Sequence, residues 1–247
     1  QDMLNRPRPR DTFTTKRRTA ALAALAYLAV HGSAEAEAAL MQGTQHANAD
    51  IRAQAVSYWG EIYLARKQSL PEPIAAALSA IAVHDPAFGP RFQARELLRE
   101  MELPVPLDNP AGVYTFKVKF KRAKTIYRVI EIKSKQTLDE LHLAIQQAIH
   151  WGNDHLYSFF MNGVTHDDRY RFSCPYEEDT PPWTSEAIIG ELGLVKGHKF
   201  VYYFDYGDSH EFEVVVTDIQ STAARAKYPR LIDSQGQAPE QYDRGEW

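Results

Sequence analysis

Residues 127–151 read YRVIEIKSKQTLDELHLAIQQAIHW and contain the change of periodicity that decides the fold. The first part is rich in β-branched residues and, with the two residues before it, predicts a strand over residues 125–133. Thr137 then stands three residues before Glu140, which is the spacing of a capping box at the start of a helix. Apolar residues follow at helical spacing, at Leu138, Leu141, Ile145 and Ile149. A strand followed by an amphipathic helix predicts an α+β domain.

Strand patterns lie on both sides of this segment. Residues 114–121, YTFKVKFK, alternate apolar and polar side chains and predict a half-buried strand that turns through KRAK into the next one. Further strands are predicted over residues 154–161, 198–204 and 209–219, the last two joined by the tight turn DYGD. An acidic excursion precedes a short helix at residues 186–194, and the tail from Tyr228 is expected to be irregular. This order predicts a β-grasp, ubiquitin-like core with an added hairpin.

The first part of the chain has helical periodicity instead. Ser33 and Asn48 stand where N-caps are expected, and Leu70-Pro71 is expected to open a fourth helix. The tetrapeptides RAQA at Arg52 and RFQA at Arg91 lie 39 residues apart, and a period near 40 in helix pairs is typical of HEAT-like repeats. Such an array is either a binding groove or a structural extension, and the sequence favours neither.

These patterns predict four segments. Charge-rich residues 1–18, with two prolines, are expected to form a flexible basic arm rather than a nucleic-acid-binding arm. The domain boundaries are then 1–18 for the arm, 19–103 for the HEAT-like helices, 104–112 for a Pro-rich linker and 113–247 for the α+β domain.

Composition restricts the class of protein. Hydrophobic residues make up 44% of the chain, charged residues 24%, and the net charge is −4, which argues against a protein that coats nucleic acid with its whole surface. The sole cysteine, Cys174, cannot form an intramolecular disulfide, so we expect a cytoplasmic protein. The apolar run at residues 20–30 follows three basic residues, as in a signal peptide, but we expect a buried helix and no membrane span.

Several motifs resemble one known family. TLDELHLAIQQAIHW, DHLYSFF, KFVYYFDYGDSHEFEV and YPRLIDSQGQAPEQY follow one another as in plasmid pRiA4b ORF-three-like proteins, over residues 114–242. The resemblance implies an α+β domain and an association with plasmids and mobile elements, and it implies no biochemical activity. Many members carry D-x-W-x-H after the turn, where this chain has His210 and Phe212.

Five polar residues of these motifs are candidates for a site: His142, His155, Asp205, Asp208 and His210. Histidine and aspartate at strand ends are able to bind a divalent metal. The alternative, which we favour, is that the aspartates cap the DYGD turn and the histidines are hydrogen-bonded core residues. No established metal motif occurs, so we assign no metal and no cofactor.

A second candidate site is basic and lies on the strand at residues 114–121. It consists of Lys117, Lys119, Lys121, Arg122 and Lys124, which together are suited to a phosphate backbone. The alternative, which we favour, is an edge strand that its lysines protect against aggregation.

We expect a non-catalytic binding or adaptor protein with a protein partner. The alternatives are a nucleic-acid-associated accessory protein of a mobile element or defence locus, and a metal-dependent enzyme that uses the His/Asp cluster. Trp151 and Phe159 are expected in the core, and Gly207 is expected to adopt positive φ in the turn. The oligomeric state stays open.

Overall fold

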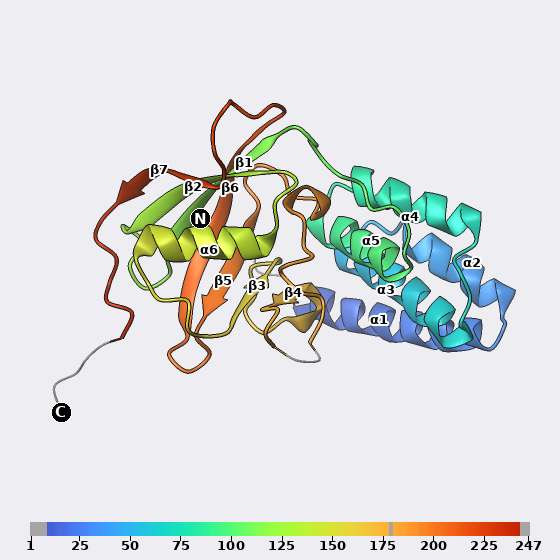
Figure 1. Ribbon diagram of the computed structural model, residues 1–247. Coiled ribbons are helices and arrows are strands. Elements are labelled where there is room, and N and C mark those ends of the chain that lie inside the picture. The colour runs from blue at the N-terminus through green and yellow to red at the C-terminus, as the bar shows by residue number, and fades with distance from the viewer. Residues whose placement is uncertain (1–8, 178–179, 243–247) are drawn as a thin grey trace. The chain divides into compact units, whose positions relative to one another are not determined.

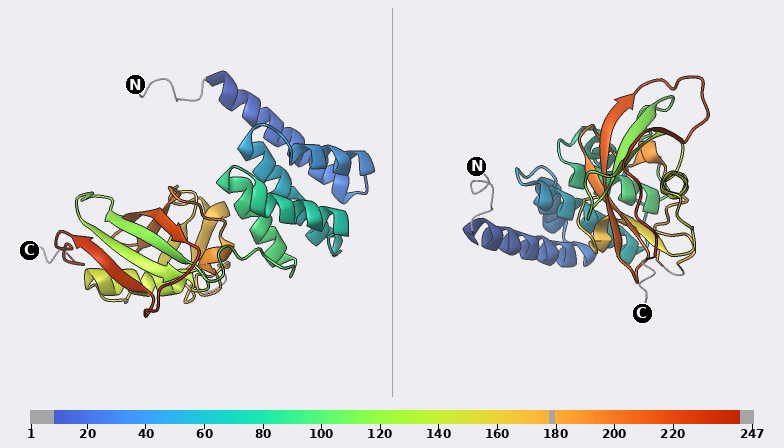
Figure 2. Two further views of the ribbon diagram at one scale, coloured as in Figure 1. Left: turned by 90° about the horizontal axis from the view of Figure 1, so that it is seen from above. Right: turned by 90° about the vertical axis from the view of Figure 1, so that its left-hand side faces the viewer.

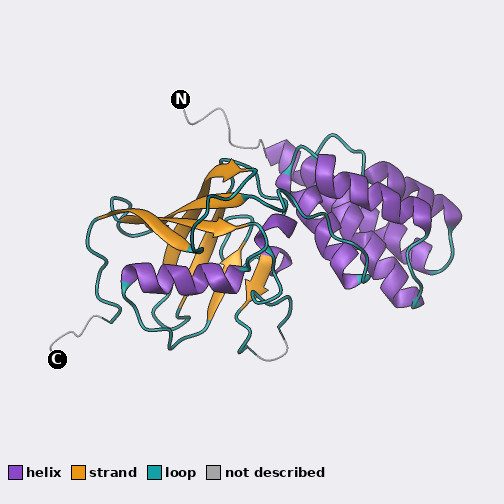
Figure 3. Ribbon diagram, turned by 45° about the horizontal axis from the view of Figure 1, so that its top comes forward, coloured by secondary structure: helices purple, strands orange, loops and turns teal. Residues whose placement is uncertain are grey.

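The computed structural model describes residues 9–177 and 180–242, with the backbone alone for residues 9–19. The chain divides into two compact units, Gln1–Pro106 and Leu107–Trp247, and each is described by itself. The described part of the first unit is helical, and the second holds a sheet with one long helix (Figure 3). Among the residues described, no helix has the length and apolar character needed to cross a membrane.

In its described residues, 9–106, the first unit packs five helices around one core (Figure 1). They are α1 (Pro9–Val30), α2 (Ala34–Gly43), α3 (Ala49–Arg66), α4 (Glu72–His84) and α5 (Phe88–Glu100). Helix α3 packs against both α1 and α5, while α2 packs on α1 and α4 on α5. The predicted caps are confirmed, because the Ser33 side chain accepts from the amide of Ala36 and the Asn48 side chain accepts from the amides of Asp50 and Ile51.

The flexible arm predicted for residues 1–18 is wrong in its described part. Helix α1 begins at Pro9, so it includes residues 9–18, whereas residues 1–8 lie outside the described part of the chain. Proline is tolerated in the first turn of a helix, where its missing N–H has no intrahelical partner. After Pro9 no further proline interrupts the helix.

Two equivalent hydrogen bonds support the predicted repeat. The Nη1 atom of Arg52 donates to the carbonyl oxygen of His46 at 2.8 Å, and that of Arg91 donates to the carbonyl oxygen of Asp85 at 2.7 Å. Each arginine reaches back six residues, across the start of α3 or α5. The Asp85 carboxylate also binds the Arg52 guanidinium through two contacts of 2.7 Å. The helix pairs therefore share local geometry, although a HEAT-type architecture in particular is not confirmed.

The second unit is built on one seven-stranded sheet. Its strands are β1 (Val113–Phe120), β2 (Tyr127–Lys133), β3 (Tyr157–Phe160), β4 (Arg171–Ser173), β5 (Lys199–Phe204), β6 (His210–Gln220) and β7 (Arg230–Gln235). The order across the sheet is β4-β3-β5-β6-β1-β2-β7, and each neighbouring pair is antiparallel. The α+β class is confirmed, but the β-grasp core is not, because β6 lies between β5 and β1 and the six described strand pairs are all antiparallel.

Helix α6 (Leu138–Ile149) crosses one face of this sheet, as the two views in Figure 2 show. It begins with the predicted capping box, in which the amide of Glu140 donates to Thr137 Oγ1 and the amide of Thr137 donates to the Glu140 carboxylate. The four predicted core positions, from Leu138 to Ile149, are all buried. Helical spacing therefore identified the face that covers the sheet.

Three sequence-based element assignments are wrong. The tail predicted to be irregular contains β7, which pairs with β2. The acidic excursion contains β4, a strand of three residues. The short helix predicted over residues 186–194 is a single 3₁₀ turn, Ile189–Glu191. All three segments depend on partners distant in sequence, so local periodicity carries little information about them.

Trp151 and Phe159 are buried, as predicted. The Trp151 ring packs edge-on against Phe120 and Phe212, with centroids 5.8 Å apart in both pairs. Its Nε1 donates to the carbonyl oxygen of Pro239 at 2.8 Å. Trp151 therefore joins the end of α6 to the sheet and to the C-terminal segment.

We expect Trp151→Ala to lower the free energy of unfolding by about 3–5 kcal/mol, because it leaves a cavity among aromatic rings. Trp151→Phe keeps most of the packing and should cost less, through loss of the hydrogen bond to Pro239, worth about 1 kcal/mol. Urea denaturation of both variants measures the difference. A loss below about 1 kcal/mol for the alanine variant would contradict the core assignment.

Candidate functional site

The polar residue at the centre of the second unit is His142, which lies on the buried face of α6 and is fully buried. Its Nε2 donates to Asn153 Oδ1 at 2.7 Å, so in the neutral ring Nδ1 is an acceptor. The Tyr202 hydroxyl therefore donates to Nδ1 at 2.8 Å, and the Tyr202 oxygen accepts from Gln146 Nε2 at 2.7 Å. Both ring nitrogens are thus occupied by protein partners.

The environment of His142 keeps its ring neutral. The ring stacks on Tyr157 with centroids 3.6 Å apart and planes 5° from parallel. Burial disfavours the charged imidazolium and lowers the pKa of His142 to about 4, although the bond to Asn153 and the charge of Asp139 act in the opposite direction. At neutral pH this histidine is a hydrogen-bonded core residue.

Tyr157 extends the network to the start of α6. Its hydroxyl donates to the Asp139 carboxylate and accepts from Thr184 Oγ1, the latter at 2.9 Å. Burial, and next the hydrogen bond to Asp139, raise the pKa of Tyr157 above the usual range of a phenol. The Asp139 amide also donates to the carbonyl oxygen of Thr184, at 3.1 Å. The long loop before β5 is therefore fixed to the helix.

The sequence analysis did not include Tyr157, Tyr202 or Asp139 among the site residues. A signal was present, because both tyrosines occupy inward positions of predicted strands and a buried phenol requires a hydrogen-bond partner. Asp139 stands in the first turn of the helix and resembles an ordinary acidic residue at a helix N-terminus.

In the DYGD turn, Asp205 has the structural role that the sequence favoured. Its Oδ1 accepts from the amide of Gly207 at 2.9 Å and from the amide of Asp208 at 3.3 Å. The positive φ angles fall on Asp205, at 58°, and Ser209, at 55°. The prediction of positive φ at Gly207 is therefore wrong. Aspartate tolerates this conformation because its side chain bonds to the local backbone.

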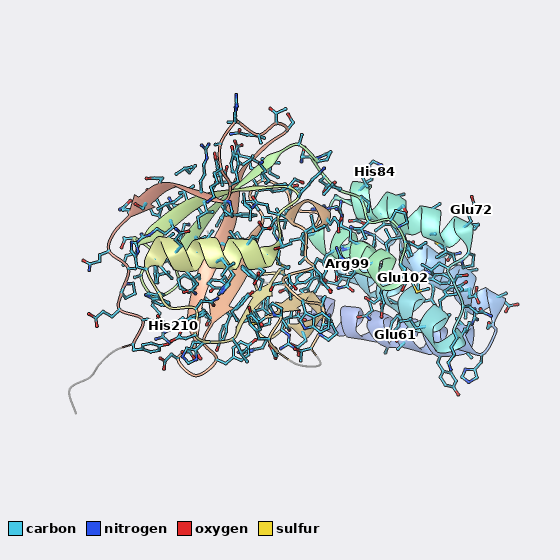
Figure 4. All side chains as sticks on the ribbon, in the orientation of Figure 1. Glu61, Glu72, His84, Arg99, Glu102 and His210 are labelled. Atoms are coloured by element: carbon cyan, nitrogen blue, oxygen red, sulfur yellow. The ribbon has the colours of Figure 1, made fainter. Side chains whose placement is uncertain are left out.

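The remaining histidines occupy separate places around this turn. His155 Nε2 lies 3.5 Å from Asp205 Oδ2, with 42% of the His155 side chain exposed. His210, labelled in Figure 4, contacts the carbonyl oxygen of Gln241 through Nε2 at 3.1 Å and lies against Trp151. Of the five predicted residues, an ion-pair contact joins only His155 and Asp205. Within residues 9–177 and 180–242, no three His, Cys, Asp or Glu side chains are placed to hold a metal ion.

Cys174 is buried. Burial raises the pKa of its thiol, even though the backbone around it favours the thiolate. A thiol in this environment is a poor nucleophile at neutral pH.

A hollow of about 690 Å³ lies beside the end of α6. Its walls are Arg128, residues 149–151 and the C-terminal segment 237–242. Hydrogen bonds hold that segment in place: Gln241 Oε1 accepts from the amide of Gly152, and the Tyr242 hydroxyl donates to Asp154 at 2.8 Å. The hollow is open, and the lining residues that could do acid–base chemistry are His150, Glu240 and Tyr242.

Two of the basic candidate residues, Lys117 and Lys119, lie on a central strand, so the edge-strand alternative is wrong: β1 pairs with both β2 and β6. Lys117 lies over the ring of Tyr127, 3.5 Å from its centroid. Lys119 binds Glu213 at 3.3 Å, and Lys121 binds Glu211. Arg122 and Lys124 are exposed in the turn that follows. Lys119 and Lys121 therefore face β6, a neighbouring strand that carries carboxylates.

Comparison with known proteins adds a family. The family model for plasmid pRiA4b ORF-3-like protein matches residues 112–246, more than half of the chain. The chain belongs to this family. It is similar to the uncharacterized protein y4hQ of Sinorhizobium fredii, with 27% identity over 141 residues that cover 56% of this chain and 69% of that one. A crystal structure of a protein of unknown function, MM3350 from Methanosarcina mazei Go1, matches with a TM-score of 0.44 and 24% identity, over 52% of this chain and 71% of that one.

In this member of the pRiA4b ORF-3-like family, His142 should make stability depend on pH. Its folded-state pKa of about 4 lies below the ordinary value of 6.5, so the unfolded chain binds the extra proton first as pH falls. Stability contributed by the neutral ring is present above pH 6.5 and is lost as pH falls toward 4. We expect a loss of about 2 kcal/mol between pH 7 and pH 5.

Urea denaturation of wild type and His142→Gln at the two pH values measures this effect as the difference between the two proteins. The glutamine variant should be less stable at pH 7 and should lack this part of the pH dependence. An equal pH dependence in both proteins would show that His142 is not the titrating group.

The DYGD turn gives a second prediction for this family member. We expect Asp205→Ala to destabilise by about 1–2 kcal/mol, because it removes the acceptor of two turn amides and a residue that tolerates positive φ. Asp205→Asn keeps both features, and Asp208→Asn should change stability by less than about 0.5 kcal/mol. Thermal unfolding with and without a chelator measures these effects. Chelator sensitivity that Asp208→Asn abolishes would instead assign the turn to metal binding.

Proposed function

We propose that this chain is a non-catalytic binding protein, and that an extended segment of a protein partner adds to its sheet along β7. The observation that carries the proposal is the open outer edge of β7, which pairs with β2 on one side and ends the described sheet on the other. An edge strand presents unpaired N–H and C=O groups to a neighbouring chain.

The side chains with catalytic potential support binding over catalysis. His142 has both nitrogens occupied and a lowered pKa, Asp205 caps a turn, and Cys174 is buried. Structural partners account for the positions of His142 and Asp205, and Cys174 is shielded from solvent. The metal-dependent alternative would require these side chains to converge on one point.

The two edges of the sheet differ in a way that favours β7. At the opposite edge, β4 has three residues, and Ser173 exchanges backbone hydrogen bonds with Pro182 and Thr184. Such a short, covered edge resists the addition of another strand. By contrast, β7 has six residues and contains neither proline nor lysine.

The side chains of β7 suggest what the partner offers. Leu231 and Ile232 are 48% and 46% exposed, and Ile232 is the extra residue of a β-bulge, because Leu231 pairs with Ile130 and Asp233 with Val129. The two charged residues of the strand have partners, since Arg230 binds Glu131 and Asp233 accepts from the Tyr127 hydroxyl. A partner segment that pairs here would be extended, with apolar side chains at alternate positions, as in other cases of strand addition.

The name of the family points to plasmids, so we place the partner among proteins of a plasmid or other mobile element. In this proposal the helical unit offers a second surface to which a partner protein binds. The alternative of a nucleic-acid-associated role rests on other residues, the lysines of β1 and of the turn that follows it.

The test is selection of extended peptides from a random phage-displayed library on the immobilised full-length chain, followed by affinity measurement. We expect Ile232→Lys to weaken the selected peptides at least tenfold, since a charge at an edge strand opposes pairing. Val195→Lys is the matched control, because Val195 is an exposed apolar residue of equal exposure to Leu231, at 48%, outside β7. The control should bind as wild type does.

Three outcomes would overturn the proposal: failure to enrich peptides, equal binding by wild type and Ile232→Lys, or equal weakening in the Val195→Lys control. A fourth outcome comes from light scattering, which measures the oligomeric state of the purified chain. A dimer that Ile232→Lys dissociates would show that a second copy, and not a partner protein, occupies the edge.

A further inference from the structure

A smaller pocket, of about 300 Å³, lies on the second unit where β1, β5 and β6 meet the turn after β3. Four lysines line it, together with one glutamate, Glu213, and the turn residues Asn162 and Gly163. The lysines are Lys119, Lys121, Lys124 and Lys199. Lys199 comes from β5, some 75 residues beyond the basic segment in the sequence, so only folding brings it to the other three.

The two nearby carboxylates do not neutralise these lysines. Glu213 stands opposite Lys119 in the β1–β6 register and is shared by two ammonium groups, Lys119 at 3.3 Å and Lys199 at 3.7 Å. Glu211 binds Lys121 and also accepts from Thr165 Oγ1. Lys124 has no ion-pair partner among the residues described. Two positive charges therefore remain in excess around a concave site.

The paired lysines are also held in place, unlike isolated surface lysines. The carboxylate of Glu213 lies between two strands, so it fixes the ammonium groups of Lys119 and Lys199 on the same side of the pocket. At Gly163 the turn approaches β5 so closely that an added Cβ would lie 3.4 Å from the carbonyl oxygen of Lys199, and its φ of 77° suits glycine. The turn therefore closes one side of the pocket with little room for a side chain.

We propose that this pocket binds a phosphate group. A phosphate monoester carries about −1.5 to −2 charge at neutral pH, which matches the excess of two positive charges. Lysines bind phosphate as point charges and need no bidentate geometry. The phosphate belongs either to a small phosphorylated molecule or to the backbone of a nucleic acid. The proposal is independent of strand addition at β7, because none of the lining residues lies in β7.

Titration calorimetry of the full chain with inorganic pyrophosphate, and fluorescence anisotropy with a labelled single-stranded oligonucleotide, test the proposal. We expect the double variant Lys124→Gln/Lys199→Gln to weaken binding at least tenfold and to reduce the salt dependence. Glu213→Gln should strengthen binding, because it removes the carboxylate that competes with the phosphate. Both lysines are exposed, so thermal unfolding should show that the variants remain folded.

The matched control is Lys133→Gln/Lys135→Gln, which removes the same charge from two exposed lysines at the far end of the β1–β2 pair. It should bind as wild type does. Lysine-dependent binding of pyrophosphate alone assigns the pocket to a small phosphorylated molecule. Oligonucleotide binding that pyrophosphate competes away assigns it to a nucleic-acid backbone. Absence of binding in both arms, or equal weakening by the control pair, overturns the proposal.

Discussion

The second unit depends on one set of interactions: the hydrogen bonds that the buried polar side chains of α6 make to the sheet. Helix α6 places His142 and Gln146 one turn apart on its buried face, and both meet the hydroxyl of Tyr202. A buried polar group without a partner costs about 1–3 kcal/mol, so these bonds select one position of the helix over the strands. Asn153 completes the set at the other ring nitrogen of His142. The same residues that resemble an acid–base site therefore define the packing.

This arrangement gives the sheet two unlike faces. The face under α6 is aromatic, with rings such as Phe116, Phe200 and Phe212 fully or almost fully buried. Strand alternation sends Lys119 and Glu213 to the other face, where they pair across strands and stay partly exposed. The polar residues of the first face are buried and hydrogen-bonded to one another. We therefore expect a ligand to bind at the second face or at the edge of the sheet.

Local signals were sufficient for part of the fold. The capping box at Thr137 and the N-caps at Ser33 and Asn48 are each formed by a side chain and amides two or three residues away, so the sequence contains both partners. Strand β7 differs, because its residues alternate poorly and it exists through pairing with β2, about 100 residues earlier. The central position of β1 was hidden for the same reason, since an alternating strand reads alike at the edge and in the middle of a sheet with one open face.

The candidate sites also differ in whether they depend on neighbouring residues or on segments distant in sequence. The turn-capping role of Asp205 follows from chemistry within four residues, and the sequence favoured it correctly, although positive φ fell on Asp205 and Ser209 instead of Gly207. The lysine pocket depends on Lys199 and on a turn after β3, which reach β1 only through the order β3-β5-β6-β1. A run of basic residues in one strand is ambiguous, because a neighbouring strand supplies either neutralising carboxylates or further lysines. Here β6 supplies carboxylates and β5 supplies a further lysine. The excess of lysines over carboxylates distinguishes a phosphate pocket from a solvated face.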